Sequence, residues 1–288
     1  KNETAKLLAN IASLINTAII SPRRWGKSSL VSKAVETASK ESNNYLFVRM
    51  NVFKCEDEQE FYATFAKSIM SQISSSVENL MSNAREFISS LLPKISVSDP
   101  AGHYEISFGV DVKTSPIDES ILDLPQTIAS KKKMKVVVCI DEFQQIGEFR
   151  NALRFQKILR NHWQEQRDVA YILYGSKKHM MLSIFGDYNR PFYRFGDIIF
   201  LPKISTEDWC DYIVGRFSAT GKSISRDVAA YLAESVDNHS YYVQQLAQAS
   251  WLRTSDTCTK DVVDSSLESI LDYLNLQFIN TMDTLTDK

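Results

Sequence analysis

Hydrophobic positions along the chain follow two different spacings, and each change of spacing predicts the start of a new element. Residues 7–15 place leucine and isoleucine at helical spacing, and residues 17–20 form a short β-branched run. Further apolar runs alternate with helical segments; the runs cover residues 45–52, 136–140, 169–174 and 197–201, and the helical segments cover residues 28–39, 61–70 and 149–163. Continuous apolar runs are typical of strands that are covered on both faces. This alternation predicts an α/β fold, with a parallel sheet and helices on both of its faces.

Two parts of the chain depart from this alternation. Residues 71–92 are Ser-rich with helical spacing, and apolar residues from Ile95 to Val112 then alternate with polar ones on both sides of Asp99-Pro100-Ala101-Gly102, which is typical of a hairpin. We expect residues 71–133 to be an insertion at the edge of the sheet. After Pro202 four segments have helical spacing with no strand between them, at residues 206–217, 226–235, 241–254 and 261–278. The chain therefore divides into an α/β domain at residues 1–203 and a helical domain at residues 204–288.

Composition excludes several classes of protein. The 288 residues include 33 Lys+Arg and 35 Asp+Glu, so a net charge of −2 provides no global basic field for nucleic acid. The four cysteines are far apart and form no C-x-x-C pair, which argues against a disulfide scaffold or a zinc ribbon and suits a reducing compartment. No apolar run approaches the ~20 residues of a membrane span, and residues 1–20 lack the features of a signal peptide. We expect a cytoplasmic protein with no membrane partner.

A glycine-containing turn follows the first strand and opens the next helix. Its sequence is Ser21-Pro22-Arg23-Arg24-Trp25-Gly26-Lys27-Ser28-Ser29, which fits G-x-x-x-x-G-K-[ST] except for Ser21 at the first glycine. In this pattern backbone N–H groups cradle phosphate, and Gly26 lets the main chain approach it closely. Lys27 would reach the β- and γ-phosphates, Ser28 would bind Mg²⁺, and Ser29 would meet the α-phosphate. A plain strand-to-helix turn is the alternative interpretation.

The tripeptide Gly-Lys-Ser alone is not specific, because Gly221-Lys222-Ser223 repeats it within the same chain. This second copy follows an amphipathic segment and is more simply a glycine that ends a helix, with a new N-cap at Ser223 or Ser225. Only the first copy has a strand before it and a helix after it, which is the context that a phosphate loop requires.

Two adjacent acids, Asp141 and Glu142, follow the apolar run 136–140. A phosphate loop needs a metal-binding carboxylate at the end of a neighbouring strand. We predict that Asp141 holds Mg²⁺ and that Glu142 polarises the attacking water as a general base. A helix cap at the end of the strand is the alternative for this pair.

Three further residues are candidates for the same site. Ser176 follows the next apolar run and would contact the γ-phosphate or water, although a serine that caps a turn explains it equally well. Arg190 and Arg194 flank Pro191-Phe192-Tyr193, and either would neutralise transition-state charge, in its own chain or across a subunit contact; a surface arginine beside a proline turn is the alternative. Separately, a basic stripe at helical spacing fits either a solvated helix face or a nucleic-acid contact; it comprises Arg150, Arg154, Lys157 and Arg160.

With these motifs the chain resembles the archaeal-type P-loop ATPase family, relatives of the AAA+ and STAND ATPases. The residues that carry the resemblance are the phosphate loop, Ile140-Asp141-Glu142-Phe143-Gln144, Tyr174-Gly175-Ser176, Arg190-Pro191-Phe192-Tyr193 and Tyr241-Tyr242-Val243-Gln244-Gln245-Leu246. The resemblance implies a P-loop NTPase sheet with a C-terminal helical lid, and ATP or ADP with Mg²⁺ as ligands. It also implies an Arg-Glu box before the first helix, of which Lys1-Asn2-Glu3 is the remnant, and a winged-helix domain after the lid. We therefore expect any DNA contact to lie in a segment outside this chain.

The function expected from these residues is Mg²⁺-dependent ATP hydrolysis that drives a conformational change. A nucleotide-gated switch or scaffold with little turnover, which recruits an unknown protein partner, is the alternative. A small-molecule or nucleoside kinase comes third, because the acid pair is better matched to activating water than to orienting a hydroxyl acceptor. An oligomer is compatible with each of these functions.

Overall fold

The computed structural model describes residues 2–75, 95–98, 105–108 and 119–286. The chain divides into two compact units, at residues 1–201 and 202–288, and each has a hydrophobic core of its own.

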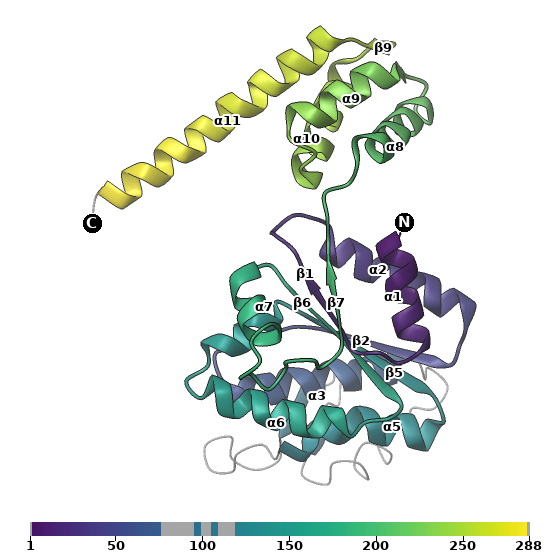
Figure 1. Cartoon of the computed structure of the whole chain (residues 1–288), viewed down its shortest axis with the longest axis vertical. Helices are drawn as coiled ribbons and strands as arrows, with labels where there is room; N and C mark the ends of the chain where they lie inside the picture. The colour runs from purple at the N-terminus through teal and green to yellow at the C-terminus, as the bar shows by residue number, and fades with distance from the viewer. Residues whose placement is uncertain (1, 76–94, 99–104, 109–118, 287–288) are drawn as a thin grey trace. The chain divides into compact units, whose positions relative to one another are not determined.

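Five parallel strands form the central sheet of the first unit (Figure 1). In spatial order they are β2 (Tyr45–Asn51), β5 (Lys135–Asp141), β6 (Val169–Gly175), β1 (Thr17–Ile20) and β7 (Asp197–Phe200). The prediction of a parallel sheet in an α/β fold is confirmed. Because all five strands run in the same direction, their carboxyl ends share one edge of the sheet.

Helices cover both faces of this sheet, as predicted. One face packs against α1 (Asn2–Ala12) and α2 (Lys27–Glu41). The other packs against α3 (Glu58–Ser75), α5 (Leu124–Lys132), α6 (Ala152–Gln164) and α7 (Lys178–Phe185), together with the 3₁₀ turns η1 (Glu119–Asp123) and η2 (Phe143–Glu148). Strand β5 contributes alternate side chains to the two cores, Val138 to one and Cys139 to the other. Helix α7 was not predicted from the sequence.

Strand β2 differs from its expected environment. Leu46, Val48 and Met50 are buried, whereas the residues between them are half-buried or exposed. The continuous apolar run predicted a strand covered on both faces; Tyr45 and Phe47 do pack against the second core, but the prediction fails at the exposed Arg49 and Asn51, because β2 is an edge strand of the sheet. An edge strand has a neighbouring strand on one side only, so its second face is less completely covered.

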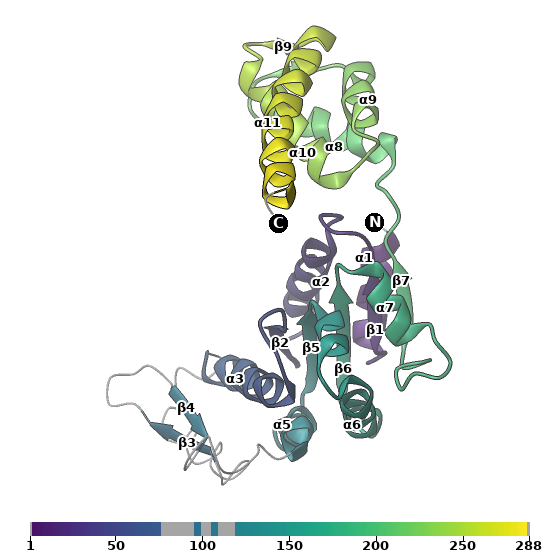
Figure 2. The same cartoon turned by 90° about the vertical axis from the view of Figure 1, so that its left-hand side faces the viewer.

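The predicted hairpin is present as β3 (Ile95–Ser98) and β4 (Glu105–Phe108), which pair antiparallel with Ile95 opposite Phe108. Within the described residues these strands form a separate two-stranded sheet and do not pair with the main sheet (Figure 2), and the placement of the insertion at the edge of the main sheet stays a prediction. The helix expected at residues 71–92 is described only as far as Ser75, where α3 ends, and the expected continuation of the hairpin to Val112 lies outside the described residues.

The second unit contains the four predicted helices, α8 (Thr206–Ser218), α9 (Arg226–Ser235), α10 (Ser240–Arg253) and α11 (Lys260–Thr286). It also contains two short strands that were not expected, β8 (Ser223–Ile224) and β9 (Thr257–Cys258), which pair in parallel. Two residues are too few to produce a period in the sequence, so these strands could not be predicted from the pattern. In the part of the chain that the structure describes, no helix combines the length and apolar character needed to cross a bilayer.

Candidate functional site

Three neighbouring strands bring the predicted site residues to the same edge of the sheet. Ile20 at the end of β1 pairs with Gly175 at the end of β6, and β6 in turn lies beside β5. The residues that follow these strands are the phosphate loop, Ser176 and the acid pair. The site therefore lies at the carboxyl ends of the strands, where α/β sheets commonly bind ligands.

The phosphate loop has the backbone that its sequence predicts. Gly26 has φ of +91°, a left-handed conformation that favours glycine, and it is the N-cap of α2 without a side chain to cap it. A Cβ added at Gly26 would meet no protein atom within 4 Å, so the backbone is accessible at this point. The N–H groups in the first turn of an α-helix have no partner within the helix and bind anions. These features fit a polyphosphate.

The serine that replaces the first glycine of the motif causes no strain. Ser21 is buried, and it is not among the residues with left-handed φ in the described chain. The ammonium group of Lys27 donates hydrogen bonds to the carbonyl oxygens of Ser21 (3.0 Å) and Pro22 (2.7 Å). Burial lowers the pKa of Lys27, while the charges of Glu142 and Asp141 raise it by a smaller amount. A buried ammonium group in the field of two carboxylates is suited to an anion that also carries a divalent cation.

Ser28 and Asp141 meet across 113 residues of sequence. The Ser28 hydroxyl donates to Asp141 Oδ2 at 3.2 Å. Burial raises the pKa of Asp141, against hydrogen bonds from the Glu142 N–H and from Ser28 that lower it. A hydroxyl and a carboxylate are the hard oxygen ligands that Mg²⁺ takes in such sites, and the bound ion would offset the cost of the buried charge. The two predicted metal ligands therefore lie together and fit this ion.

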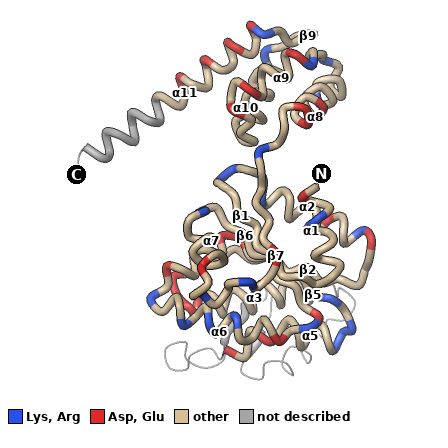
Figure 3. Tube along the Cα trace, in the orientation of Figure 1, with Lys and Arg blue, Asp and Glu red and all other residues tan. Residues whose placement is uncertain are grey.

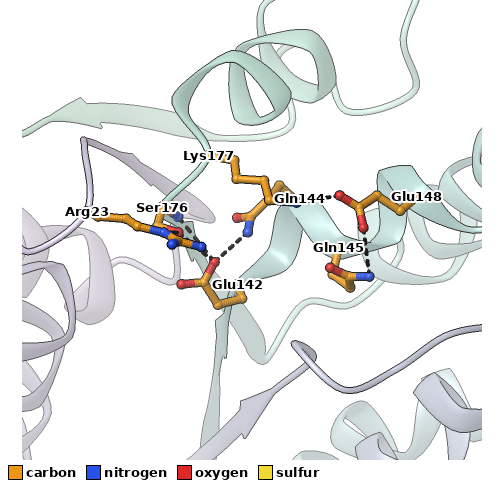
Figure 4. A network of polar contacts seen from close by, with 7 residues as sticks. All are labelled: Arg23, Glu142, Gln144, Gln145, Glu148, Ser176 and Lys177. Atoms are coloured by element: carbon orange, nitrogen blue, oxygen red, sulfur yellow. Dashed lines mark hydrogen bonds and ion pairs between the residues drawn. The ribbon is translucent and has the colours of Figure 1, made fainter. Parts of the chain in front are cut away.

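Glu142 is held in an unusual conformation by polar neighbours (Figure 4). Its φ is +54°, a left-handed value that a non-glycine residue adopts only when the surrounding structure imposes it. Its Oε2 accepts hydrogen bonds from Gln144 Nε2 at 2.5 Å and from the Ser176 hydroxyl at 2.9 Å. The guanidinium of Arg23 in turn donates to Ser176 Oγ at 3.3 Å. A continuous chain of contacts therefore links the phosphate loop to the acid pair.

Gln144 is a member of this site to which the sequence analysis gave no role. Its side chain is 1% exposed, and a Cβ added at Gly175 would lie 1.7 Å from its Oε1 atom. Gly175 is therefore glycine because the Gln144 amide lies against its backbone. The available sequence clue was a glutamine two residues after Glu142, directly after the apolar Phe143.

A second pair of contacts holds the turn after β6 against η2. The ammonium group of Lys177 lies 2.5 Å from a carboxylate oxygen of Glu148, and Gln145 donates to the same carboxylate at 3.1 Å. These groups are exposed, so they contribute little stability, but they restrict the position of Ser176.

Glu142 also borders a cavity of about 690 Å³. Its walls come from the end of β2 and from α3, and its other lining residues are Asn51, Phe53, Lys54, Cys55, Glu60, Ala63 and Thr64.

The structure does not bring Arg190 and Arg194 to this site. Arg194 is three residues before β7, and β7 starts opposite Thr17, at the amino end of β1. The phosphate loop follows the opposite end of β1. Arg190 lies 3.6 Å from Asp187, and Arg194 lies over the ring of Tyr193. A role for either arginine within its own chain is therefore not supported, because the loop before β7 returns to the far edge of the sheet.

The second Gly-Lys-Ser copy has a different environment. Gly221 has φ of +75° after the end of α8, and Ser225 caps α9 by accepting a hydrogen bond from the Val228 N–H. Lys222 donates to the carbonyl of Trp251 at 2.7 Å and lies 4.2 Å from the centre of its indole ring. The interpretation of this copy as a helix end followed by a new cap is confirmed.

Comparison with known proteins gives one family and several similar structures. The family model described as Predicted AAA-ATPase matches residues 5–179. The fold is similar to that of the Walker-type ATPase paby2304 of Pyrococcus abyssi, at 13% identity and a TM-score of 0.67, over 99% of this chain and 74% of that one. It is also similar to Aeropyrum pernix ORC2 in ADPNP-ADP complexes (13%, TM-score 0.60, 93% and 67%) and to Aeropyrum pernix ORC1 in complex with DNA (12%, TM-score 0.56, 93% and 64%). No curated protein matches the sequence at a significant level.

Proposed function

The chain belongs to the predicted AAA-ATPase family, and from this premise we propose that it binds ATP with Mg²⁺ at the carboxyl edge of the sheet and hydrolyses it to ADP and phosphate. The observation that carries the proposal is the 3.2 Å contact between Ser28 and Asp141, because it joins the phosphate loop to the acid pair. Ser28 and Asp141 would together hold a divalent cation, which would neutralise charge on the phosphates of the nucleotide.

In this proposal the phosphate loop supplies the binding energy. The first turn of α2 and Lys27 neutralise the phosphates, Ser29 meets the α-phosphate, and Pro22, Arg23, Arg24 and Trp25 surround the nucleotide. Mg²⁺, when bound by Ser28 and Asp141, polarises the phosphoryl oxygens. Binding would also offset the desolvation that lowers the pKa of Lys27 and raises that of Asp141.

Glu142 is the general base in this proposal. Its carboxylate would accept a proton from the attacking water, while Gln144 and Ser176 hold Oε2 in place. Arg190 or Arg194 could act on transition-state charge only from a second copy of the chain, and such an oligomer stays a prediction.

A switch with little turnover is the second candidate function, and one observation favours it. Two side-chain hydrogen bonds already engage Oε2 of Glu142, so this oxygen would have to exchange a partner before it could accept a proton from water. A multiple-turnover assay separates the two functions, since a switch would bind ATP but would release no phosphate at steady state.

Three variants test the assignment, with titration calorimetry for Mg²⁺-ATP binding and phosphate release for turnover. We expect Lys27→Ala to abolish binding, and Glu142→Gln to keep binding and lose hydrolysis. Lys222→Ala is the matched control from the second Gly-Lys-Ser copy, and it should change neither. Normal turnover in both Lys27→Ala and Glu142→Gln would remove the proposal.

The remaining expectations are also proposals. We propose that residues 204–288 act as a lid whose position reports on bound ATP or ADP, and that an unknown protein partner reads this state. Cytoplasmic location stays a prediction. Nucleotide and DNA in the ORC structures belong to those proteins, and at the identities observed the likeness concerns the fold.

A further inference from the structure

Helix α6 has an exposed face that carries positive charge and no acid. Residues 149–164 include four Lys and Arg and neither Asp nor Glu. Within α6 the exposed residues Arg154, Lys157, Asn161 and Gln164 follow one another at i, i+3, i+7 and i+10, so they form one stripe. Phe155, Leu159 and Trp163 are buried on the opposite side. Figure 3 shows Lys and Arg recurring along α6.

The loop before β7 adds to this face, although it is distant in sequence. A hollow of about 320 Å³ is lined by Lys157, Arg160, Asn161 and Gln164 from α6 and by residues 188–191 from the loop. Tyr188 is 77% exposed, so its ring is open to a ligand. The guanidinium of Arg160 lies 4.9 Å from the centre of the Phe195 ring, and its Nε donates to Gln164 at 3.2 Å. This packing holds the guanidinium of Arg160 in place before any ligand binds.

The charges of this face are poorly neutralised by the protein itself. The lining of the hollow includes three cations and no acid. Arg190 has an acidic neighbour, Asp187 at 3.6 Å, but Arg154, Lys157 and Arg160 form no ion pair within the residues that the structure describes. An anionic ligand would therefore meet charges that are free to pair with it.

The face is separate from the nucleotide site. The carboxyl end of α6 precedes the first residue of β6, and the loop with Tyr188 and Arg190 precedes the first residue of β7. The hollow therefore lies toward the amino edge of the sheet, whereas the phosphate loop lies at the carboxyl edge. Arg154, in the first turn of α6, is the residue of the face nearest the carboxyl edge. The two sites can be changed independently.

We propose that this face, defined by Arg154, Lys157, Arg160, Tyr188 and Arg190, binds single-stranded nucleic acid, a function beyond the ATPase proposed above. At about 1.5 Å per residue the stripe from Arg154 to Gln164 is roughly 15 Å long, enough to follow the phosphates of two or three nucleotides. The exposed ring of Tyr188 beside the cations offers a surface on which a base stacks, which is how single strands are bound without sequence preference. The amides of the lining can bond to base edges.

Other polyanions match the face less well. A membrane surface would need several long aliphatic side chains to insert beside the cations, and among the described residues that line the hollow the apolar ones are Pro191 and Tyr188. An acidic peptide would use the cations but not the open ring. The family resemblance led us to expect DNA contact only outside this chain, and the stripe on α6 by itself is also typical of a solvated helix. The loop with Tyr188 and Arg190 adds a hollow and an open ring to the stripe, and these favour a nucleic-acid contact within this chain.

The test measures fluorescence anisotropy of the full chain with labelled oligo(dT) of about 20 nucleotides. We expect the double variant Arg154→Glu with Lys157→Glu to weaken binding about tenfold or more, and to make the slope of log affinity against log salt shallower by about 1.4, since each single-strand phosphate contact contributes about 0.7. Tyr188→Ala should weaken binding by about fivefold, through lost stacking. Lys157→Gln is a milder change that serves if the double variant fails to fold.

Two controls separate this face from general charge and from the nucleotide site. Lys67→Glu with Arg216→Glu changes the net charge equally at exposed residues of α3 and α8, and it should bind oligo(dT) as the unchanged chain does. Lys27→Ala should also leave oligo(dT) binding unchanged, whatever it does to ATP. The proposal would be overturned if the chain did not bind oligo(dT), or if it bound polyglutamate or anionic vesicles equally well. It would also be overturned if the charge control lost as much binding as the face variants, or if the face variants bound oligo(dT) as the unchanged chain does.

Discussion

The side-chain amide of Gln144 lies against the backbone of Gly175, so closely that a Cβ at residue 175 would be 1.7 Å from Gln144 Oε1. The same amide donates to Glu142 through Nε2 at 2.5 Å. A backbone feature of one strand end therefore sets the position of the proposed general base on another. Two predictions, on Gly175 and on Gln144, depend on this contact.

Gly175→Ala should displace Gln144 and uncouple it from Glu142. We expect the free energy of unfolding to fall by about 1–3 kcal/mol, as for other overpacked sites, and ATP turnover to fall while Mg²⁺-ATP binding is retained. Denaturant titration and phosphate release measure the two effects. Gly147→Ala is the matched control, because its added Cβ would meet its nearest neighbour, the flexible end of Met180, at an ordinary 3.5 Å. Equal effects of the two substitutions would contradict the prediction.

Gln144→Leu should remove the hydrogen bond to Glu142 and keep the volume of the side chain. A hydrogen bond to a charged group contributes about 1.5–3 kcal/mol, so we expect kcat to fall by about tenfold or more. The KM for ATP should stay constant, and Gln144→Asn should restore part of the activity. Gln145→Leu removes a similar amide from the same turn, but that amide bonds to the exposed Glu148, and kcat should not respond. A rise in KM with unchanged kcat would show that Gln144 acts elsewhere.

Ser28→Ala should change the dependence on Mg²⁺ more than the affinity for nucleotide. Removing the hydroxyl takes away one of the two proposed oxygen ligands, so half-maximal turnover should require about tenfold more Mg²⁺. Ser29→Ala retains both of these ligands and serves as the control. A titration with Mg²⁺ at saturating ATP measures the effect, and identical curves for the two variants would argue against the metal site.

Asp141→Asn should stabilise the protein in a way that depends on pH. Burial raises the pKa of Asp141 above its ordinary value of 3.8, so the folded protein binds the proton more tightly than the unfolded chain does. Stability therefore falls as pH rises from 3.8 through the raised pKa, and above that range the charged carboxylate imposes its full cost. Asparagine avoids this cost, so the Tm of the variant without Mg²⁺ should exceed that of the unchanged chain at neutral pH. The difference should vanish below pH 3.8; a difference that stays constant with pH would exclude this cause.

The local parts of the site follow from residues that are close in sequence. The β-branched run at residues 17–20, the glycine at 26 and the helical spacing after it predict a strand, a turn and a helix, and the structure contains all three. The acid pair, Asp141 and Glu142, likewise stands at the end of a strand, as the apolar run 136–140 predicts. Backbone conformation and hydrophobic periodicity are decided largely within a few residues, which is why the sequence by itself determined the phosphate loop, the acid pair and the α/β class of the fold.

Only the tertiary structure decided which of these parts meet. The order of strands places β6 between β1 and β5, and parallel packing then brings Ser28 to Asp141 across 113 residues. The close approach of Gln144 to Gly175, and the return of the loop with Arg190 to the amino edge beside α6, also depend on segments distant in sequence. Such contacts are set by how strands and helices pack against one another, and no periodicity within a single segment records that packing.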